Sequence, residues 1–177
     1  MPLPFDLILL THSNEYRRWH NTGRWLGCHT NAVTTITWSR HLTQAEISSE
    51  DHIWLVFPQS SAADSRHAAT LTLQPVNTSQ PRPTLLLLDG TWQEARKMLQ
   101  QTPWLKELPR YSLESAEVME KSEFYLRRNQ EDKGLSTFET AARLCQAAGD
   151  NQTSIRLLSG FRQYQQAFRL SRGDIQP

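Results

Sequence analysis

The sequence lacks any apolar run that could cross a membrane, and it has only two cysteines. A bilayer-spanning helix needs about 18 or more apolar residues, and no stretch of the 177 residues approaches this length. Cys28 and Cys145 lie too far apart in sequence to form a CxxC pair, and isolated thiols are typical of reduced, cytoplasmic proteins. The N-terminus has no basic region or small-residue cleavage site and carries Asp6, so we expect no signal peptide.

Internal repeats, low-complexity tracts and an obvious interdomain linker are also absent. Hydrophobic residues make up 38% of the chain, which is enough for a real core and excludes a disordered protein. A chain of 177 residues suits one compact core better than two small ones. We therefore expect a single domain over residues 1–177.

A strong excess of basic charge, the usual mark of a nucleic-acid-binding protein, is missing as well. Nineteen Lys and Arg against eighteen Asp and Glu give a net charge of +1. The charges are nevertheless unevenly spread, because residues 1–45 and the last 28 residues carry more basic than acidic side chains, whereas residues 46–81 are acidic. This distribution is compatible with a local basic face on a neutral protein.

Three short apolar runs predict the strands of a parallel sheet. They are Phe5–Leu10, Ile53–Phe57 and Thr84–Leu88, and the second and third are stopped by Pro58 and by Asp89-Gly90. Continuously apolar runs of this length are typical of strands that are buried on both faces.

Helices are predicted after and between these strands. Three Ser/Thr-to-Glu pairs have the spacing of a capping box and precede helices expected at 44–50, 92–101 and 137–148. A further amphipathic helix is expected over Thr153–Leu170. Its predicted buried stripe is Ile155, Leu158, Phe161, Gln165 and Phe168. A proline-broken loop covers 75–83. The alternation predicts an α/β fold, with a mostly parallel sheet flanked by helices.

The segment 85–98 carries the clearest chemical signal. A buried strand ends at Asp89, Gly90 permits a tight turn, and Thr91 can cap the helix that begins at Trp92. In open α/β sheets, ligands bind beyond the carboxyl ends of the strands, which is where Asp89 is expected. The alternative is that Asp89 and Thr91 only organise the turn and cap the helix.

Four ordered motifs resemble those of the DTW-domain family, the tRNA-uridine aminocarboxypropyltransferases. Asp89-Gly-Thr-Trp92 resembles the D-x-T-W signature, and Phe57-Pro58 resembles a short F-P element. The other two motifs resemble E-x-x-R…N-T-G and Y-x-x-R…S-T-x-E. The residues that carry them are Glu15–Arg18, Asn21–Gly23, Tyr125–Arg128 and Ser136–Glu139. Together the four motifs cover residues 10 to about 145.

The resemblance implies both a reaction and a fold. The family transfers the 3-amino-3-carboxypropyl group of S-adenosylmethionine to N3 of a uridine in tRNA, and methylthioadenosine is released. The fold is similar to the knotted (SPOUT-like) α/β methyltransferases, so a C-terminal trefoil knot is expected. Many bacterial members carry a cysteine cluster before the N-T-G motif. This chain begins directly with the first strand, so we expect no metal and no separate N-terminal zinc-binding element.

The implied reaction assigns roles to the residues around Asp89. A carboxylate near the uridine N3–H can serve as general base, most effectively if burial raises its pKa. Asp89 is the candidate, either as that base or as an anchor that orients the base or the cofactor. Trp92 offers an aromatic wall for the adenosine, the methionine arm or the base, and ordinary core packing is its alternative. The flanking residues are further cofactor-binding candidates: Leu88, Gly90 and Thr91.

Two other segments are expected to contact the cofactor. Phe57 and Pro58 form the loop after a strand that lines the cofactor in knotted folds, although Pro58 can also serve only to end the strand. Ser136 and Thr137 lie at a helix N-terminus, whose free N–H groups suit a carboxylate such as that of methionine. A capping box is the alternative role of Ser136.

Basic residues near aromatic ones are the candidates for binding RNA. Asn21, Thr22, Gly23 and Arg24 are expected to form a polar turn, with Gly23 at φ > 0. Arg24 can bind the transferring carboxylate or an RNA phosphate. Four other arginines are candidate phosphate contacts, and solvated surface positions are their alternative role. They are Arg17, Arg18, Arg127 and Arg128, near Trp19, Trp25 and Tyr125.

Our first hypothesis is thus a cytoplasmic, monomeric transferase that uses S-adenosylmethionine and tRNA, with no membrane partner. One alternative is an RNA methyltransferase of the knotted class, in which another sulfonium carbon faces the acceptor. The other is a non-catalytic RNA-binding module that keeps the fold. The histidines at 12, 20, 29 and 41 show no metal-ligand spacing, so we expect surface or hydrogen-bonded positions for them.

Overall fold

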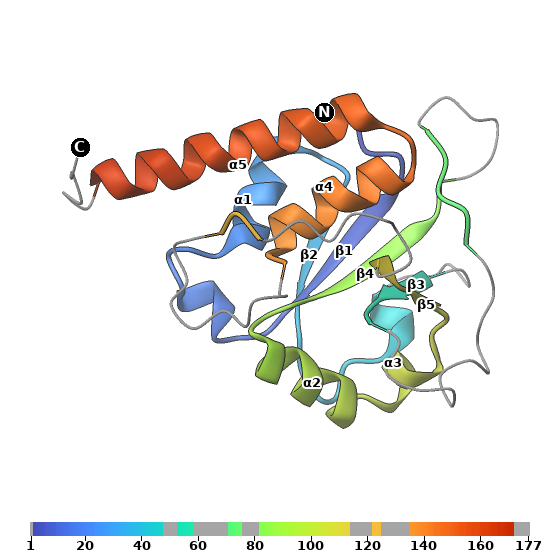
Figure 1. Cartoon of the computed structure of the whole chain (residues 1–177). Helices are drawn as coiled ribbons and strands as arrows, with labels where there is room; N and C mark the ends of the chain where they lie inside the picture. Colours follow the sequence, from blue (N-terminus) through green and yellow to red (C-terminus); the bar gives the residue numbers. More distant parts are fainter. Residues whose placement is uncertain are drawn as a thin grey trace.

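Five parallel strands form one sheet with helices on both of its faces (Figure 1). The computed structural model describes residues 2–47, 53–58, 71–75, 82–113, 122–124 and 135–171. The strands are β1 (Asp6–Thr11), β2 (Val33–Thr37), β3 (Ile53–Val56), β4 (Thr84–Asp89) and β5 (Arg110–Tyr111), in the order β2-β1-β4-β3-β5. Every neighbouring pair is parallel. The predicted α/β domain with a parallel sheet is therefore confirmed.

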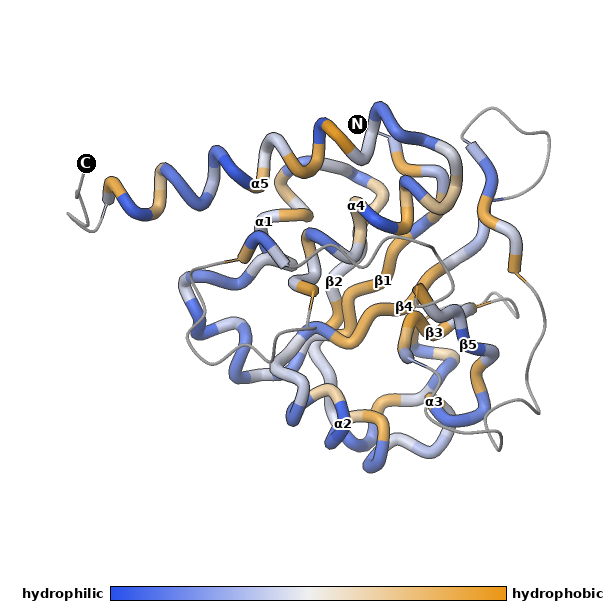
Figure 2. Tube along the Cα trace, in the orientation of Figure 1, coloured by the Kyte–Doolittle hydropathy of each residue, from blue (hydrophilic) through white to orange (hydrophobic). Residues whose placement is uncertain are grey.

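The central strands are continuously apolar between their polar end residues because both of their faces are covered. In Figure 2 the hydrophobic colour is concentrated in β1 and β4. Leu7 and Leu9 of β1 belong to the core on one face of the sheet, and Ile8 and Leu10 belong to the core on the other. This alternation accounts for the short continuous apolar runs of the sequence.

Three helices cover the first face and two cover the second. The first face carries α1 (Thr22–His29), α4 (Thr137–Ala147) and α5 (Asn151–Ser171), which bury Leu26, Phe138 and Phe161 against the sheet. The second carries α2 (Trp92–Gln101) and α3 (Pro103–Glu107). The predicted helices at 92–101 and 137–148 are confirmed, as is a helix over Thr153–Leu170.

The buried stripe of α5 agrees with the predicted one except at its start. Phe161 and Gln165 are buried, and Leu158 and Phe168 pack partly buried against the core. The prediction is wrong for Ile155, which is 66% exposed, and Leu157 and Tyr164 are buried in addition. Phe161 stacks on Phe138 of α4, with ring centroids 5.2 Å apart. Packing of α5 on α4 holds the N-terminus of α4 in place beside the sheet.

The predicted helix at 44–50 is wrong for the residues that the structure describes there. Gln44–Glu46 form a 3-10 turn, η2, and residues 48–52 lie outside the described part of the chain. The capping box between Thr43 and Glu46 is present, but η2 buries no side chain. A capping box alone does not specify a full helix, because helix stability in proteins comes mainly from tertiary packing.

Connections leave β1 and β4 in opposite directions, which creates a crevice between the ends of these two strands. β1 continues through α1 to β2, which lies at one edge of the sheet. β4 continues through α2 and α3 to β5, which lies at the opposite edge. The helices α1 and α2 also lie on opposite faces. In open α/β sheets such a switch point is where ligands bind. Thr11 and Asp89, the last residues of β1 and β4, are paired in register there.

Candidate active site

The carboxylate of Asp89 is the centre of a buried hydrogen-bond network at this switch point. Asp89 is 3% exposed. Its Oδ2 accepts hydrogen bonds from Thr11 Oγ1 and from Asn21 Nδ2, both at 3.1 Å. Its Oδ1 accepts one from Thr137 Oγ1 at 2.7 Å. Three segments that are far apart in the sequence therefore meet at one carboxylate.

The local folding of each segment accounts for its position. Asn21 is the N-cap of α1, and its Oδ1 accepts a hydrogen bond from Arg24 N at 2.6 Å. Thr137 is the first residue of α4, directly after the capping residue Ser136. The N-termini of α1 and α4 thus both lie beside Asp89, and the partial positive charge of a helix N-terminus favours an anion there.

Position 23 requires a glycine because the Asp89 carboxylate occupies the space that a side chain there would need. The expectation that Gly23 adopts φ > 0 is wrong, since Gly23 lies inside α1 and Gly149 is the glycine with positive φ among the described residues. A Cβ atom on Gly23 would lie 2.7 Å from Asp89 Oδ2 and 2.9 Å from its Cγ. Real Cβ atoms essentially never approach other atoms so closely. The glycine therefore lets α1 pack directly against the carboxylate.

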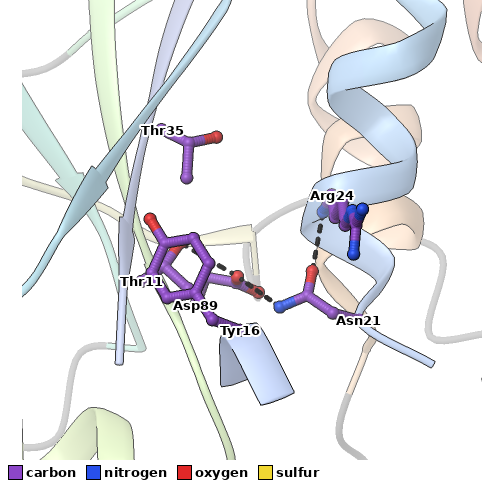
Figure 3. A pocket seen from close by; sticks show the side chains of 6 residues that line it. All are labelled: Thr11, Tyr16, Asn21, Arg24, Thr35 and Asp89. Atoms are coloured by element: carbon purple, nitrogen blue, oxygen red, sulfur yellow. Dashed lines mark hydrogen bonds between the residues drawn. The ribbon is translucent and has the colours of Figure 1, made fainter. Parts of the chain in front are cut away.

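A pocket of about 230 Å³ opens beside this network (Figure 3). Its lining comes from β1, β2, β4, α1 and the 3-10 turn η1 (Glu15–Arg17). The lining residues are Thr11, Tyr16, Asn21, Arg24, Thr35 and Asp89. Thr11, Tyr16 and Thr35 were not among the residues predicted from the sequence. Thr11 directly follows the first apolar run, as Asp89 follows the third, and this parallel position is the signal that could have identified it.

The pocket contains one negative and one positive side chain that do not pair. The guanidinium of Arg24 forms no hydrogen bond or ion pair with any residue in the described part of the chain, and its side chain is exposed. Asn21 lies between the two charged residues, because its amide nitrogen donates to Asp89 and its oxygen accepts from the Arg24 backbone.

Glu94 ties the start of α2 to the loop that follows β1. Its carboxylate accepts hydrogen bonds from the Thr91 backbone N–H, the Thr91 hydroxyl and Asn14, and it forms an ion pair with Arg18 at 2.9 Å. Burial alone would raise the pKa of Glu94, but these donors, Arg18 foremost, hold it at about 2. Arg18 also pairs with Glu15. Arg18, one of the predicted phosphate contacts, is therefore engaged by two carboxylates. Thr91 caps α2, as predicted.

The predicted cofactor residues Phe57 and Trp92 form a separate pair at the same edge of the sheet. Their rings are stacked, with centroids 5.1 Å apart and planes inclined by 13°. The guanidinium of Arg96 lies 5.1 Å from the Trp92 ring, and that of Arg110 lies 5.8 Å from the Phe57 ring. Trp92 is 40% exposed. Neither ring belongs to the lining of the pocket beside Asp89.

The remaining predicted residues serve several local roles. Ser136 N donates to the carboxylate of buried Glu139, and Glu139 N donates to Ser136 Oγ, which completes the capping box of α4. Ser122 Oγ donates to the same carboxylate. Thr22 is buried in the first turn of α1. Leu88 and Gly90, on either side of Asp89, are half-buried, and so is Pro58.

Arg17 is exposed in η1, and the neighbouring Trp19 is 49% exposed and stacks on Phe168 of α5 at 3.9 Å. Arg127 and Arg128 lie outside the described residues. Within the described ranges, no group of three His, Cys, Asp or Glu side chains could hold a metal ion.

Comparison with known proteins bears directly on the residues of this pocket. The family model described as DTW domain matches residues 1–169, which include the entire network around Asp89. No solved structure matches the chain. Among the helices of the described part, none is long and apolar enough to cross a membrane.

Proposed function

The chain belongs to the DTW-domain family, and on that premise we propose that it transfers the 3-amino-3-carboxypropyl group of S-adenosylmethionine to N3 of a uridine in tRNA. The proposal includes a cytoplasmic location, a monomeric enzyme and no metal ion. The expected C-terminal knot remains a prediction.

One observation carries this proposal. Residues from three of the four family motifs meet at the switch point of the sheet, where Asn21 and Thr137 both donate hydrogen bonds to the carboxylate of Asp89. The arrangement lies beside a pocket, where α/β folds bind their ligands. A chain that kept the fold only to bind RNA on its surface would not need a buried carboxylate with three donors from three separate segments.

The proposed transfer depends mainly on how the protein orients the donor and the uridine, and it needs no unusual reactive group from the protein. The donor supplies an electrophilic γ-carbon next to its sulfonium sulfur. Uridine N3 loses its proton to the solvent and forms a bond to this carbon. The carbon–sulfur bond breaks, and its electron pair remains on sulfur, so that neutral methylthioadenosine leaves. Holding two reactants in attack geometry can lower a barrier by about 7–11 kcal/mol. The pocket residues are proposed to provide that orientation for the donor.

The acceptor is proposed to approach over the exposed aromatic and basic residues near the pocket. Arg17 is the last residue of η1, and Trp19 follows it two positions later. Because Tyr16 of η1 lines the pocket, a phosphate and a base contacted there would be next to the site. The stacked pair of Phe57 and Trp92 offers a second aromatic surface at the same edge of the sheet. Arg127 and Arg128 remain predicted phosphate contacts.

Transfer with two labelled donors tests the proposed function. The protein is incubated with unmodified tRNA and with S-adenosylmethionine labelled either on the methyl carbon or on the carboxypropyl carbons. The nucleosides are then analysed by mass spectrometry. We expect label from the carboxypropyl carbons alone, on uridine. Label from the methyl carbon would instead identify a methyltransferase, and retained tRNA binding without transfer would identify a binding module.

A further inference from the structure

We propose that the pocket beside Asp89 binds the α-amino-acid end of the donor, with Arg24 on the carboxylate and Asp89 on the ammonium group. The inference rests on the proposed function and assigns a part of the donor to a particular place. It also decides between two roles of Arg24 that the sequence left open, a contact to the transferring carboxylate or to an RNA phosphate.

The charge pattern of the pocket is complementary to a zwitterion. Arg24 and Asp89 line the same pocket, yet the Arg24 guanidinium pairs with no described residue. The Asn21 side chain donates to the Asp89 carboxylate and accepts from the backbone N–H of Arg24, which leaves the guanidinium unengaged by it. A cation and an anion that share a pocket without pairing leave room for a ligand that carries both charges. The guanidinium of arginine presents two parallel donors that match a carboxylate.

Asp89 has the capacity for one more donor. An ionised carboxylate offers about four acceptor positions, and Thr11, Asn21 and Thr137 occupy three of them. The remaining position lies on Oδ1, which accepts only the Thr137 hydroxyl among the hydrogen bonds of the described residues. The three neutral donors also fix the direction of the carboxylate. These features suit an anchor for an ammonium group and make Asp89 a positioning carboxylate in this account.

The volume of the pocket fits a part of the donor and not the whole. Pockets that enclose a complete drug-sized ligand measure about 300–1,000 Å³, whereas this pocket measures about 230 Å³. A short aliphatic amino acid is the part of S-adenosylmethionine that carries opposite charges at one end. The Thr11 and Thr35 side chains and the Tyr16 ring provide apolar atoms against which its methylene groups can pack. The adenosine would then lie outside this pocket.

Binding measurements with three related compounds test the assignment without relying on turnover. The compounds are S-adenosylmethionine, its decarboxylated form and methylthioadenosine, titrated by calorimetry into the full chain. Wild type should bind S-adenosylmethionine about 10- to 100-fold more tightly than the decarboxylated form, as expected for a charge-assisted hydrogen-bond pair. In Arg24→Ala this preference should disappear, while the affinity for methylthioadenosine should remain unchanged. Arg40→Ala removes an exposed arginine elsewhere and should bind all three compounds like wild type.

The outcomes separate this inference from the proposed function. A preference for the carboxylate that survives in Arg24→Ala, or that wild type lacks, would overturn the assignment while leaving transfer from the donor intact. Failure of all three compounds to bind to wild type would overturn both the assignment and the proposed function. Arg24 is exposed, so its replacement does not endanger folding.

Discussion

Replacing Gly23 by alanine should destabilise the protein, although the same change in most helices is stabilising. Alanine is favoured over glycine by about 0.8–1.0 kcal/mol inside a helix. At Gly23, however, the new Cβ would lie 2.7 Å from Asp89 Oδ2, which is 0.7 Å short of the 3.4 Å at which ordinary contact begins. The carboxylate must therefore shift, and the two hydrogen bonds on Oδ2, both 3.1 Å long, are the first that it loses.

The expected size of the effect follows from these two opposing terms. A hydrogen bond to a charged group contributes about 1.5–3 kcal/mol. Loss of one such bond, less the gain in helix propensity, lowers the free energy of unfolding by about 0.5–2 kcal/mol. The same helix contains its own control, because a Cβ on Gly27 would meet nothing within 4 Å. Gly27→Ala should raise the free energy of unfolding by up to about 1 kcal/mol.

Urea unfolding of wild type, Gly23→Ala and Gly27→Ala, followed by circular dichroism, measures this difference. We expect the two variants to lie on opposite sides of wild type, about 1–3 kcal/mol apart, with unchanged m-values. Equal stabilisation by both substitutions would refute the close packing of α1 on the Asp89 carboxylate. Gly23→Ala should also bind S-adenosylmethionine more weakly than Gly27→Ala in calorimetry, because the proposed anchor has moved.

Three further substitutions probe the rest of the network and the core. The pKa of Glu94 is about 2 in the folded protein, whereas its ordinary value is 4.5. The ionised Glu94 carboxylate therefore stabilises the fold above pH 4.5, and this stabilisation is lost as the pH falls toward 2. Urea unfolding should show a loss of up to about 3 kcal/mol for wild type over this range and a much smaller one for Glu94→Gln. Thr137→Val removes the 2.7 Å hydrogen bond to Asp89, and urea unfolding should show a loss of about 1.5–3 kcal/mol. Phe161→Ala empties a fully buried site between α4 and α5, and should lower the free energy of unfolding by about 3–5 kcal/mol.

Sequence patterns predicted the elements whose residues are buried and capped. The apolar runs of β1, β3 and β4 and the capping boxes of α2 and α4 reflect local rules that hold in the structure. The edge strand β2 escaped prediction because three of its five residues, Thr34, Thr35 and Thr37, are exposed and polar. The helix α1 was missed because it contains two glycines, which disfavour helices unless packing compensates.

The candidate site shows the same limit in more detail. Asp89 was placed at a strand end, as the structure has it. Its partner Thr11 could not be identified, since this contact depends on β1 and β4 being neighbours although 72 residues separate Thr11 from Thr84. The role of Gly23 was predicted from backbone conformation, whereas the structure assigns it to the lack of a side chain beside Asp89. Contacts between distant segments are set by topology, which local patterns do not contain.

The by-product of the reaction tests the central claim most directly. Transfer of the aminocarboxypropyl group leaves methylthioadenosine, and transfer of a methyl group leaves S-adenosylhomocysteine. The protein is incubated with S-adenosylmethionine in the presence and absence of unmodified tRNA, and the small molecules are separated by liquid chromatography and weighed. We predict methylthioadenosine in proportion to the modified uridine, formed only when tRNA is present. Accumulation of S-adenosylhomocysteine, or no tRNA-dependent product at all, would contradict the proposed function.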